Sequence, residues 1–178
     1  MNEEILRQVK LLAIDVDGTL TRGEVLYSEL GDELKIFNIA DGLAITLCQH
    51  AGLLTAIVTG RESHAVERRA KELHVSMIFQ GCRDKGKAIK EIREKHRITK
   101  EEIAFIGDDI NDIPGFRESG VRFAVASGAA ELKSQADYVT MLPGGDGAVR
   151  EVIEMILRAQ GKWESAVQSY LRQLEQAE

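Results

Sequence analysis

Five short apolar runs recur along the chain, and each of them ends in polar residues or glycine. Successive residues of each run are apolar, so both faces of the strand that it predicts would be buried, which is typical of a parallel sheet. The expected strands cover residues 11–14, 53–58, 75–79, 103–106 and 122–126.

Segments with the apolar spacing of helices fill the intervals between these runs. They cover residues 42–50, 62–73, 85–95 and 147–159. Strands and helices therefore alternate along the chain, and this order predicts an α/β fold, a doubly wound parallel sheet with helices on both faces.

One segment near the N-terminus departs from this order. Residues 24–28 and 34–38 alternate between apolar and polar side chains, with Gly31 and Asp32 between them. This pattern predicts a β-hairpin, within residues 20–38, inserted directly after the first strand. We expect residues 1–160 to form one domain that includes the hairpin. Residues 161–178 would form a helical tail that packs on the domain, extends into a neighbour or frays.

Polar side chains gather where the apolar runs stop. Residues at or just after these ends include Asp15, Asp17, Thr59, Lys85 and Asp108. The carboxyl ends of the strands of an open parallel sheet border one crevice, where ligands bind. We therefore expect these five side chains to meet in a single site.

Asp15 and Asp17 lie two positions apart after a strand that should be buried. An unpaired buried carboxylate costs free energy, so a cation is expected nearby, and Mg²⁺ prefers oxygen ligands. An aspartate beside such a metal can attack phosphorus and form an aspartyl-phosphate. A capped surface turn is the alternative. A calcium loop is disfavoured because Leu20 and Thr21 stand where further oxygen ligands would be needed.

Basic and hydroxyl side chains at two other strand ends suit an anionic ligand. The Thr59 hydroxyl and the backbone N–H groups beside Gly60 could hold a phosphate, and Arg61 could bind a second anion. Lys85 could stabilise negative charge that develops on phosphate oxygens. Each of these residues, taken alone, is explained as well by a turn or by a solvated helix start.

A second acidic group follows the fourth apolar run. It comprises Asp108, Asp109 and Asp112, which is more acid than helix capping requires. We expect Asp108 to be a further metal ligand and Asp112 to orient Lys85. Asp109 would contact the metal ligands and would not bind the metal itself.

In this order, residues 15–19, Thr59, Lys85 and residues 107–112 resemble the motifs of the haloacid dehalogenase superfamily of phosphohydrolases. The resemblance extends to about residue 160. It implies that Asp15 is the nucleophile and that Asp17 is the general acid and base. It further implies phosphate binding by Thr59, Gly60 and Lys85, with Mg²⁺ held by the Asp15 carboxylate, the Asp17 backbone carbonyl and Asp108.

The intervals between these motifs are too short for a separate cap domain, since a domain usually needs at least about 50 residues. The chain thus resembles the capless subgroup of the superfamily. In that subgroup the hairpin drives formation of a homotetramer, and adjacent subunits cover each other's sites.

Further stretches resemble the 3-deoxy-D-manno-octulosonate 8-phosphate phosphatases of lipopolysaccharide sugar biosynthesis: residues 31–37, 41–42, 59–63, 79–81 and 144–151. By this resemblance Arg61 and Arg69 would bind the sugar acid, and eight positions along a helix would place them on roughly the same side. Ala40 and Arg22 differ from the pattern and leave a nine-carbon sugar-acid 9-phosphate as an alternative substrate, although Arg61 favours the eight-carbon one.

A non-enzymatic alternative is a phosphoacceptor module of receiver type, which also uses Asp, Thr, Lys and Mg²⁺ on a doubly wound sheet. The order of the acidic pairs disfavours it, because the paired aspartates here come after both the first and the fourth strand. Asp17 would also supply a built-in acid for hydrolysis. Multiple turnover of a phosphomonoester would distinguish the enzyme from the module.

Composition limits the partners. The chain has 178 residues, a net charge of −6 and 5% aromatic residues, which argues against nucleic acid and anionic membranes as partners. No apolar run approaches the roughly 18 residues of a membrane span, and residues 1–10 carry no signal-peptide core. Cys48 and Cys82 form no CxxC pair and suggest a reducing compartment. We therefore expect a cytoplasmic protein, and the resemblance implies that its partner is a small-molecule sugar-acid phosphate.

Overall fold

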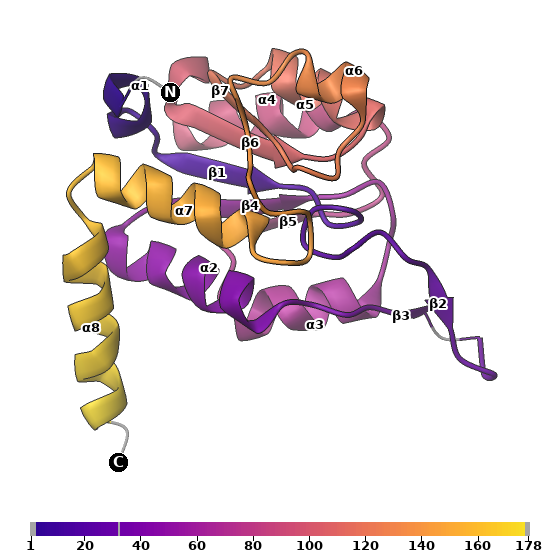
Figure 1. Cartoon of the computed structure of the whole chain (residues 1–178), viewed down its shortest axis with the longest axis horizontal. Helices are drawn as coiled ribbons and strands as arrows, with labels where there is room; N and C mark the ends of the chain where they lie inside the picture. Colours follow the sequence, from indigo (N-terminus) through magenta and orange to yellow (C-terminus); the bar gives the residue numbers. More distant parts are fainter. Residues whose placement is uncertain (1–2, 32, 177–178) are drawn as a thin grey trace.

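The structure, a computed structural model, describes residues 3–31 and 33–176. Within these residues six parallel strands form the main sheet, in the order β5-β4-β1-β6-β7-β8 (Figure 1). Their bounds are β1 Leu11–Ile14, β4 Leu54–Val58, β5 Met77–Phe79, β6 Ile103–Gly107, β7 Val121–Ala124 and β8 Tyr138–Val139. The doubly wound parallel sheet predicted from the apolar runs is confirmed. The sixth strand, β8, was not predicted because its two residues are too few to produce a pattern.

Helices cover both faces of this sheet (Figure 1). One face carries α1 Glu3–Arg7, α2 Ile39–Ala51, α3 His64–Glu72, α7 Ala148–Ala159 and α8 Trp163–Gln176, and the other carries α4 Lys85–His96, α5 Ile113–Arg117 and α6 Ala130–Lys133. Leu12 and Ile14 of β1 belong to the first core, whereas Leu11 and Ala13 belong to the second. Both cores need apolar residues because successive side chains of a strand point to opposite faces, which explains the unbroken runs.

The register of the central strands places the site. Ile14 of β1 lies beside Ile57 of β4 on one side and beside Ile106 of β6 on the other. The three strands therefore end at the same level. The segments that follow β4 and β6 therefore begin on either side of Asp15. In a doubly wound sheet, a crevice for ligands opens at the carboxyl edge where neighbouring connections diverge in this way.

The segment after β1 forms a small antiparallel pair, β2 Leu26–Tyr27 and β3 Glu33–Leu34, in which Leu26 faces Leu34. Figure 1 shows this pair set apart from the main sheet. The strands are shorter than residues 24–28 and 34–38, and Asp32 of the expected turn lies outside the described residues. A two-stranded ribbon that stands alone buries little apolar surface and is only marginally stable, which explains why the paired strands are short.

The C-terminal helix α8 packs on α2 of its own chain. The His50 ring meets the Tyr170 ring edge-on at 5.8 Å, and His50 Nδ1 lies 2.9 Å from Ser169 Oγ. Trp163 is buried at the start of α8, with the guanidinium of Arg158 at 5.2 Å from its ring centre. The last residues of the expected tail, 177–178, lie outside the described residues. No helix in the described part of the chain combines the length and apolarity needed to cross a bilayer.

Candidate active site

Asp15 and Lys85 form a buried ion pair at the end of β1. Lys85 Nζ lies 2.6 Å from Asp15 Oδ1, and both side chains are almost inaccessible to solvent. Lys85 is the first residue of α4, and the Asp84 side chain caps that helix by accepting from the N–H groups of Gly86 and Lys87. A well-capped helix start thus holds the ammonium beside the carboxylate.

Three carboxylates converge at this point. Oxygens of Asp15, Asp108 and Asp112 lie within 4.8 Å of one another. Burial, and then the neighbouring charge of Asp112, raise the pKa of the Asp15 carboxyl well above its usual range. The same two causes raise the pKa of Asp108 to about 6. The ammonium of Lys85 offsets one of these charges, so the cluster suits a divalent cation that would neutralise the excess.

The oxygens of Asp112 already accept from donors in the protein. Oδ1 accepts from Lys85 Nζ, the contact expected between these residues, and Oδ2 accepts from the backbone N–H groups of Asp108 at 2.9 Å and Asp109 at 3.3 Å. Asp112 therefore fixes the loop after β6, and Asp15 and Asp108 are the carboxylates better placed to bind a cation. Asp109 is exposed and caps the 3₁₀ turn η2 Ile110–Asp112 by accepting from the Ile110 N–H at 2.7 Å.

The turn that carries Asp17 is packed from two sides. Gly18 has a φ of +91°, and a Cβ there would lie 2.0 Å from Asp108 Oδ2. From the other side, a Cβ on Gly144 would lie 1.7 Å from the carbonyl oxygen of Gly18, and the Gly145 N–H donates to the Thr19 carbonyl at 2.9 Å. Only glycine allows such close approach of backbone to backbone. The glycine-rich loop of residues 144–147 thus supports the turn between β1 and the hairpin.

Asp41 links this loop to α2. Its buried carboxylate accepts from the backbone N–H groups of Gly147 at 3.3 Å and Arg150 at 2.8 Å, at the start of α7. Gly147 has no side chain with which to cap α7, so an acid from α2 supplies the missing acceptor. Asp41 was part of a motif in the sequence but had no role in our expectations, since its partners are more than a hundred positions away.

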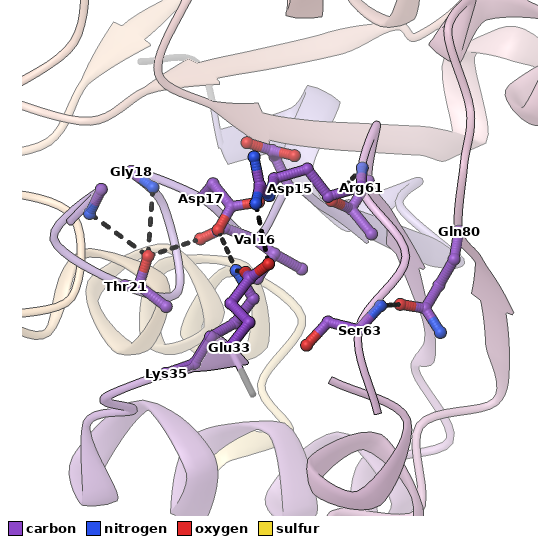
Figure 2. A network of polar contacts seen from close by, with 12 residues as sticks. Asp15, Val16, Asp17, Gly18, Thr21, Glu33, Lys35, Arg61, Ser63 and Gln80 are labelled. Atoms are coloured by element: carbon purple, nitrogen blue, oxygen red, sulfur yellow. Dashed lines mark hydrogen bonds and ion pairs between the residues drawn. The ribbon is translucent and has the colours of Figure 1, made fainter. Parts of the chain in front are cut away.

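Thr59 and the residues after it form the side of the site built from β4. Thr59 is buried, and its Oγ accepts from the Arg61 N–H at 3.4 Å, while Gly60 is exposed. The Ser63 N–H donates to Gln80 Oε1 at 2.8 Å, as Figure 2 shows. This bond joins the segments after β4 and β5, so the sequence motifs at residues 59–63 and 79–81 meet at one edge of the sheet.

A chain of alternating charges connects Asp17 to Arg61 through the hairpin (Figure 2). Lys35 Nζ contacts Asp17 Oδ1 and lies 2.6 Å from Glu33 Oε1, and Glu33 Oε2 accepts from Arg61 Nη2 at 2.7 Å. Sequence reasoning gave no role to Lys35 or Glu33. A signal was present, because Lys35 is a single cation between the apolar residues Leu34 and Ile36 of an alternating segment.

The two arginines expected to bind substrate contact different parts of the chain. Helix α3 begins at His64, so Arg61 precedes it, and the expectation that one helix presents Arg61 and Arg69 on the same side was wrong. Arg69 donates to Glu72 at 3.3 Å, and its Nη2 lies 2.2 Å from the position of a Cβ on Gly42. Arg69 thus packs against the start of α2, whereas Arg61 is partly exposed beside the hairpin.

Comparison with known proteins agrees with this geometry. A family model described as haloacid dehalogenase-like hydrolase matches residues 77–153. The 3-deoxy-D-manno-octulosonate 8-phosphate phosphatase KdsC of Escherichia coli K12 is 40% identical over 158 residues, 89% of this chain and 84% of that protein. The Haemophilus influenzae enzyme is 38% identical over 160 residues, 90% of this chain and 89% of that protein.

Solved structures give the same result. The phosphatase of Moraxella catarrhalis, in complex with a magnesium ion, a phosphate ion and 3-deoxy-D-manno-octulosonate (KDO), superposes with a TM-score of 0.91 at 40% identity, covering 94% of this chain and 97% of that one. The cobalt-bound form of the H. influenzae phosphatase has a TM-score of 0.85 at 38% identity, covering 89% of this chain and 92% of that one. The chain belongs to the 3-deoxy-D-manno-octulosonate 8-phosphate phosphatase family of haloacid dehalogenase-like hydrolases.

Proposed function

We propose that this protein is a Mg²⁺-dependent phosphatase that hydrolyses 3-deoxy-D-manno-octulosonate 8-phosphate to the free sugar acid and inorganic phosphate. The observation that carries the proposal is the buried cluster of Asp15, Lys85 and Asp108 at the end of β1. Relatives that are 38–40% identical over most of their length carry the name of this activity. One of the similar structures holds a magnesium ion, a phosphate ion and the sugar acid.

The carboxylates of Asp15 and Asp108 would hold the Mg²⁺ ion, with the backbone carbonyl of Asp17 as a further oxygen ligand. The fit rests on the convergence of carboxylate oxygens, since those of Asp15, Asp108 and Asp112 lie within 4.8 Å of one another. Burial, and then the charge of Asp112, raise the pKa of both the Asp15 and the Asp108 carboxyl groups in the metal-free protein. When bound, the ion neutralises charge between the nucleophile and the phosphate oxygens.

Asp15 and Asp17 would divide the chemistry between them. An Asp15 oxygen attacks phosphorus while the bond from phosphorus to the sugar oxygen breaks, and Asp17 donates a proton to that leaving oxygen. Asp17, now a carboxylate, then takes a proton from a water molecule. That water attacks the aspartyl-phosphate, so that inorganic phosphate leaves and the Asp15 carboxylate is restored.

Phosphate binding is assigned to groups that border Asp15. Lys85 would stabilise the phosphoryl oxygens from beside the nucleophile, while the Thr59 hydroxyl and the backbone N–H of Gly60 would bind them from the end of β4. We assign the carboxylate of the sugar acid to Arg61, whose planar guanidinium suits it. Arg69, which lies on Gly42, would act by fixing α3 on α2. Asp112 and Asp109 would act on the loop that carries Asp108.

A homotetramer is the assembly that we propose, built on the hairpin. Large apolar side chains are exposed on and beside it: Val25, Leu26, Tyr27, Leu30, Leu34, Ile36 and Ile39. Leaving apolar surface in water costs about 25 cal/mol per Å². Contiguous apolar surface on a soluble chain commonly marks an interface between proteins, and adjacent subunits would then cover each other's sites.

We place the enzyme in the cytoplasm. Cys48 and Cys82 are both free thiols in the structure, and reducing compartments keep thiols in this state.

The function is tested by multiple-turnover phosphate release with Mg²⁺. We expect kcat/KM to be highest for the eight-carbon sugar-acid 8-phosphate, lower for a nine-carbon 9-phosphate, and negligible without Mg²⁺. A preference for the nine-carbon ester would contradict the assigned substrate. A long-lived phosphoprotein without turnover would instead indicate a phosphoacceptor module.

A further inference from the structure

The hairpin places a buried ammonium group against the general acid. The Lys35 side chain is 2% exposed, and its Nζ contacts Asp17 Oδ1. Lysine is almost never so deeply buried unless it is paired. Lys35 comes from the end of the inserted hairpin, whereas Asp17 comes from the turn after β1. Both segments are therefore needed to form the contact.

We propose that Lys35 is a positioning residue for Asp17, an inference that rests on the proposed role of Asp17 as general acid and base. An ammonium group can only donate hydrogen bonds. By occupying Oδ1 it directs the proton that Asp17 delivers to Oδ2, and it restricts rotation of the carboxyl group. Holding a catalytic group in its reactive orientation lowers the entropic part of the barrier.

Glu33 holds Lys35 in place from the other side. Its Oε1 lies 2.6 Å from Lys35 Nζ, and its Oε2 lies 2.7 Å from Arg61 Nη2. The charges alternate along the row from Asp17 through Lys35 and Glu33 to Arg61, so every contact in it is attractive. Lys35 is therefore fixed between two carboxylates and does not reach into the crevice as a free cation. This row of charges therefore connects Arg61, which we assign to the sugar-acid carboxylate, with Asp17, which we assign to the leaving oxygen.

A positioning role and a merely structural role predict different kinetics. Protonation of the leaving oxygen matters for an alkyl phosphate, because an alkoxide is a strong base. It matters little for 2,4-dinitrophenyl phosphate, whose leaving group departs without a proton. The ratio kcat/KM reports the steps up to formation of the aspartyl-phosphate, which include departure of the leaving group. A structural defect would lower this ratio for both esters alike.

The experiment compares Lys35→Met and Lys35→Arg with the wild type on both esters, the alkyl one being 3-deoxy-D-manno-octulosonate 8-phosphate. A general acid typically contributes roughly 100-fold or more to the rate, and Lys35 would account for part of that factor. For Lys35→Met we therefore expect kcat/KM to fall by at least about 10-fold on the alkyl ester and by less than about 3-fold on the dinitrophenyl ester. Lys35→Arg should recover part of the loss, since a guanidinium can also donate to Oδ1. Lys95→Met, at an exposed position near the end of α4, is the charge-matched control and should change neither ratio.

A double substitution tests whether the effect passes through Asp17. Added to Asp17→Asn, the Lys35→Met change should cause no further loss on the alkyl ester, because the two residues act as one unit. Equal losses on both esters, or additive losses in the double variant, would overturn the proposal. If Lys35→Met does not fold, as judged by circular dichroism and sedimentation, the same comparisons are made with Lys35→Arg. A wild type that hydrolyses neither ester contradicts the proposed function, whereas an active wild type with insensitive variants contradicts only the role of Lys35.

Discussion

Lys85 Nζ lies 2.6 Å from Asp15 Oδ1, although 70 positions separate the two residues in the chain. The contact exists because β1 ends at Ile14, directly before Asp15, and α4 begins at Lys85. Helix α4 packs in the same core as Leu11 and Ala13 of β1, so its first residue reaches the end of that strand. The same ammonium contacts Asp112, so one cation connects the acidic groups that follow β1 and β6. The predictions below test this cluster and its surroundings.

Replacement of Asp15 by Asn should abolish turnover and leave the fold intact. We expect phosphate release to fall by at least about 1,000-fold, because the amide oxygen is a poor nucleophile. The raised pKa of Asp15 indicates that its charge is unfavourable in the metal-free protein. The melting temperature of the metal-free variant at pH 7.5 should therefore be no lower than that of the wild type. Residual phosphate release near the wild-type rate would exclude Asp15 as the nucleophile.

Replacement of Lys85 by Ala should destabilise the protein as well as inactivate it. Removal of one partner from a buried ion pair typically costs about 3–5 kcal/mol, since the other charge stays buried without compensation. Here two carboxylates, Asp15 and Asp112, would lose the ammonium. Urea unfolding of the metal-free protein measures the loss, with the exposed Lys95→Ala as control. An unchanged urea midpoint would show that the pair contributes nothing to stability.

Binding of Mg²⁺ should weaken as the pH falls. In the metal-free protein the pKa of Asp108 is about 6, and that of Asp15 is also raised, so both carboxyl groups bind protons more readily than usual. Below about pH 6 the metal must displace a proton, and its dissociation constant should rise at least about tenfold per pH unit. Calorimetric titrations at pH 5.0, 6.0 and 7.5 measure this. Equal affinities at pH 5.0 and 7.5 would contradict the protonation of these groups.

Replacement of Gly144 by Ala should impair catalysis from outside the crevice. The new Cβ would lie 1.7 Å from the Gly18 carbonyl oxygen, so the turn bearing Asp17 must shift. We expect kcat to fall by about 10-fold or more, since small misplacements of catalytic groups are costly. Gly52→Ala is the matched control, because Gly52 has a φ of +70° but no atom within 4 Å of its Cβ position. It should lose about 1 kcal/mol of stability and no activity. Comparable kcat values for the two variants would mean that the loop does not position the turn.

Replacement of Ile36 by Asp should dissociate the homotetramer that we propose. Ile36 is 73% exposed next to the hairpin, and a charge there would be buried without a partner in an interface between copies. Sedimentation equilibrium should give a tetramer for the wild type and smaller species for the variant. Ile5→Asp, on the exposed surface of α1 at the other end of the sheet, is the control and should remain tetrameric. A tetrameric Ile36→Asp variant would place the interface elsewhere.

Several features followed from local patterns alone. The unbroken apolar runs predicted a parallel sheet buried on both faces, because strand geometry sends successive side chains to opposite sides. The order of strands and helices also predicted that Asp15 and Asp108 would meet, since parallel strands end at a common edge. The carboxylates of these two residues do lie in one cluster. Such inferences need only the period of the strands and the direction in which they run.

Other features depend on where distant segments dock, and no local pattern encodes that. Asp41 caps α7 and Lys35 contacts Asp17 only because α2 and the hairpin fold back onto the sheet. Arg61 lies before α3 and not on it, so the helical period does not put its side chain on the same side as that of Arg69. The residue types and their order therefore determined the chemistry available to this protein. Tertiary packing decided which charges touch, because contact energies fall off within a few ångströms while the partners lie tens of residues apart.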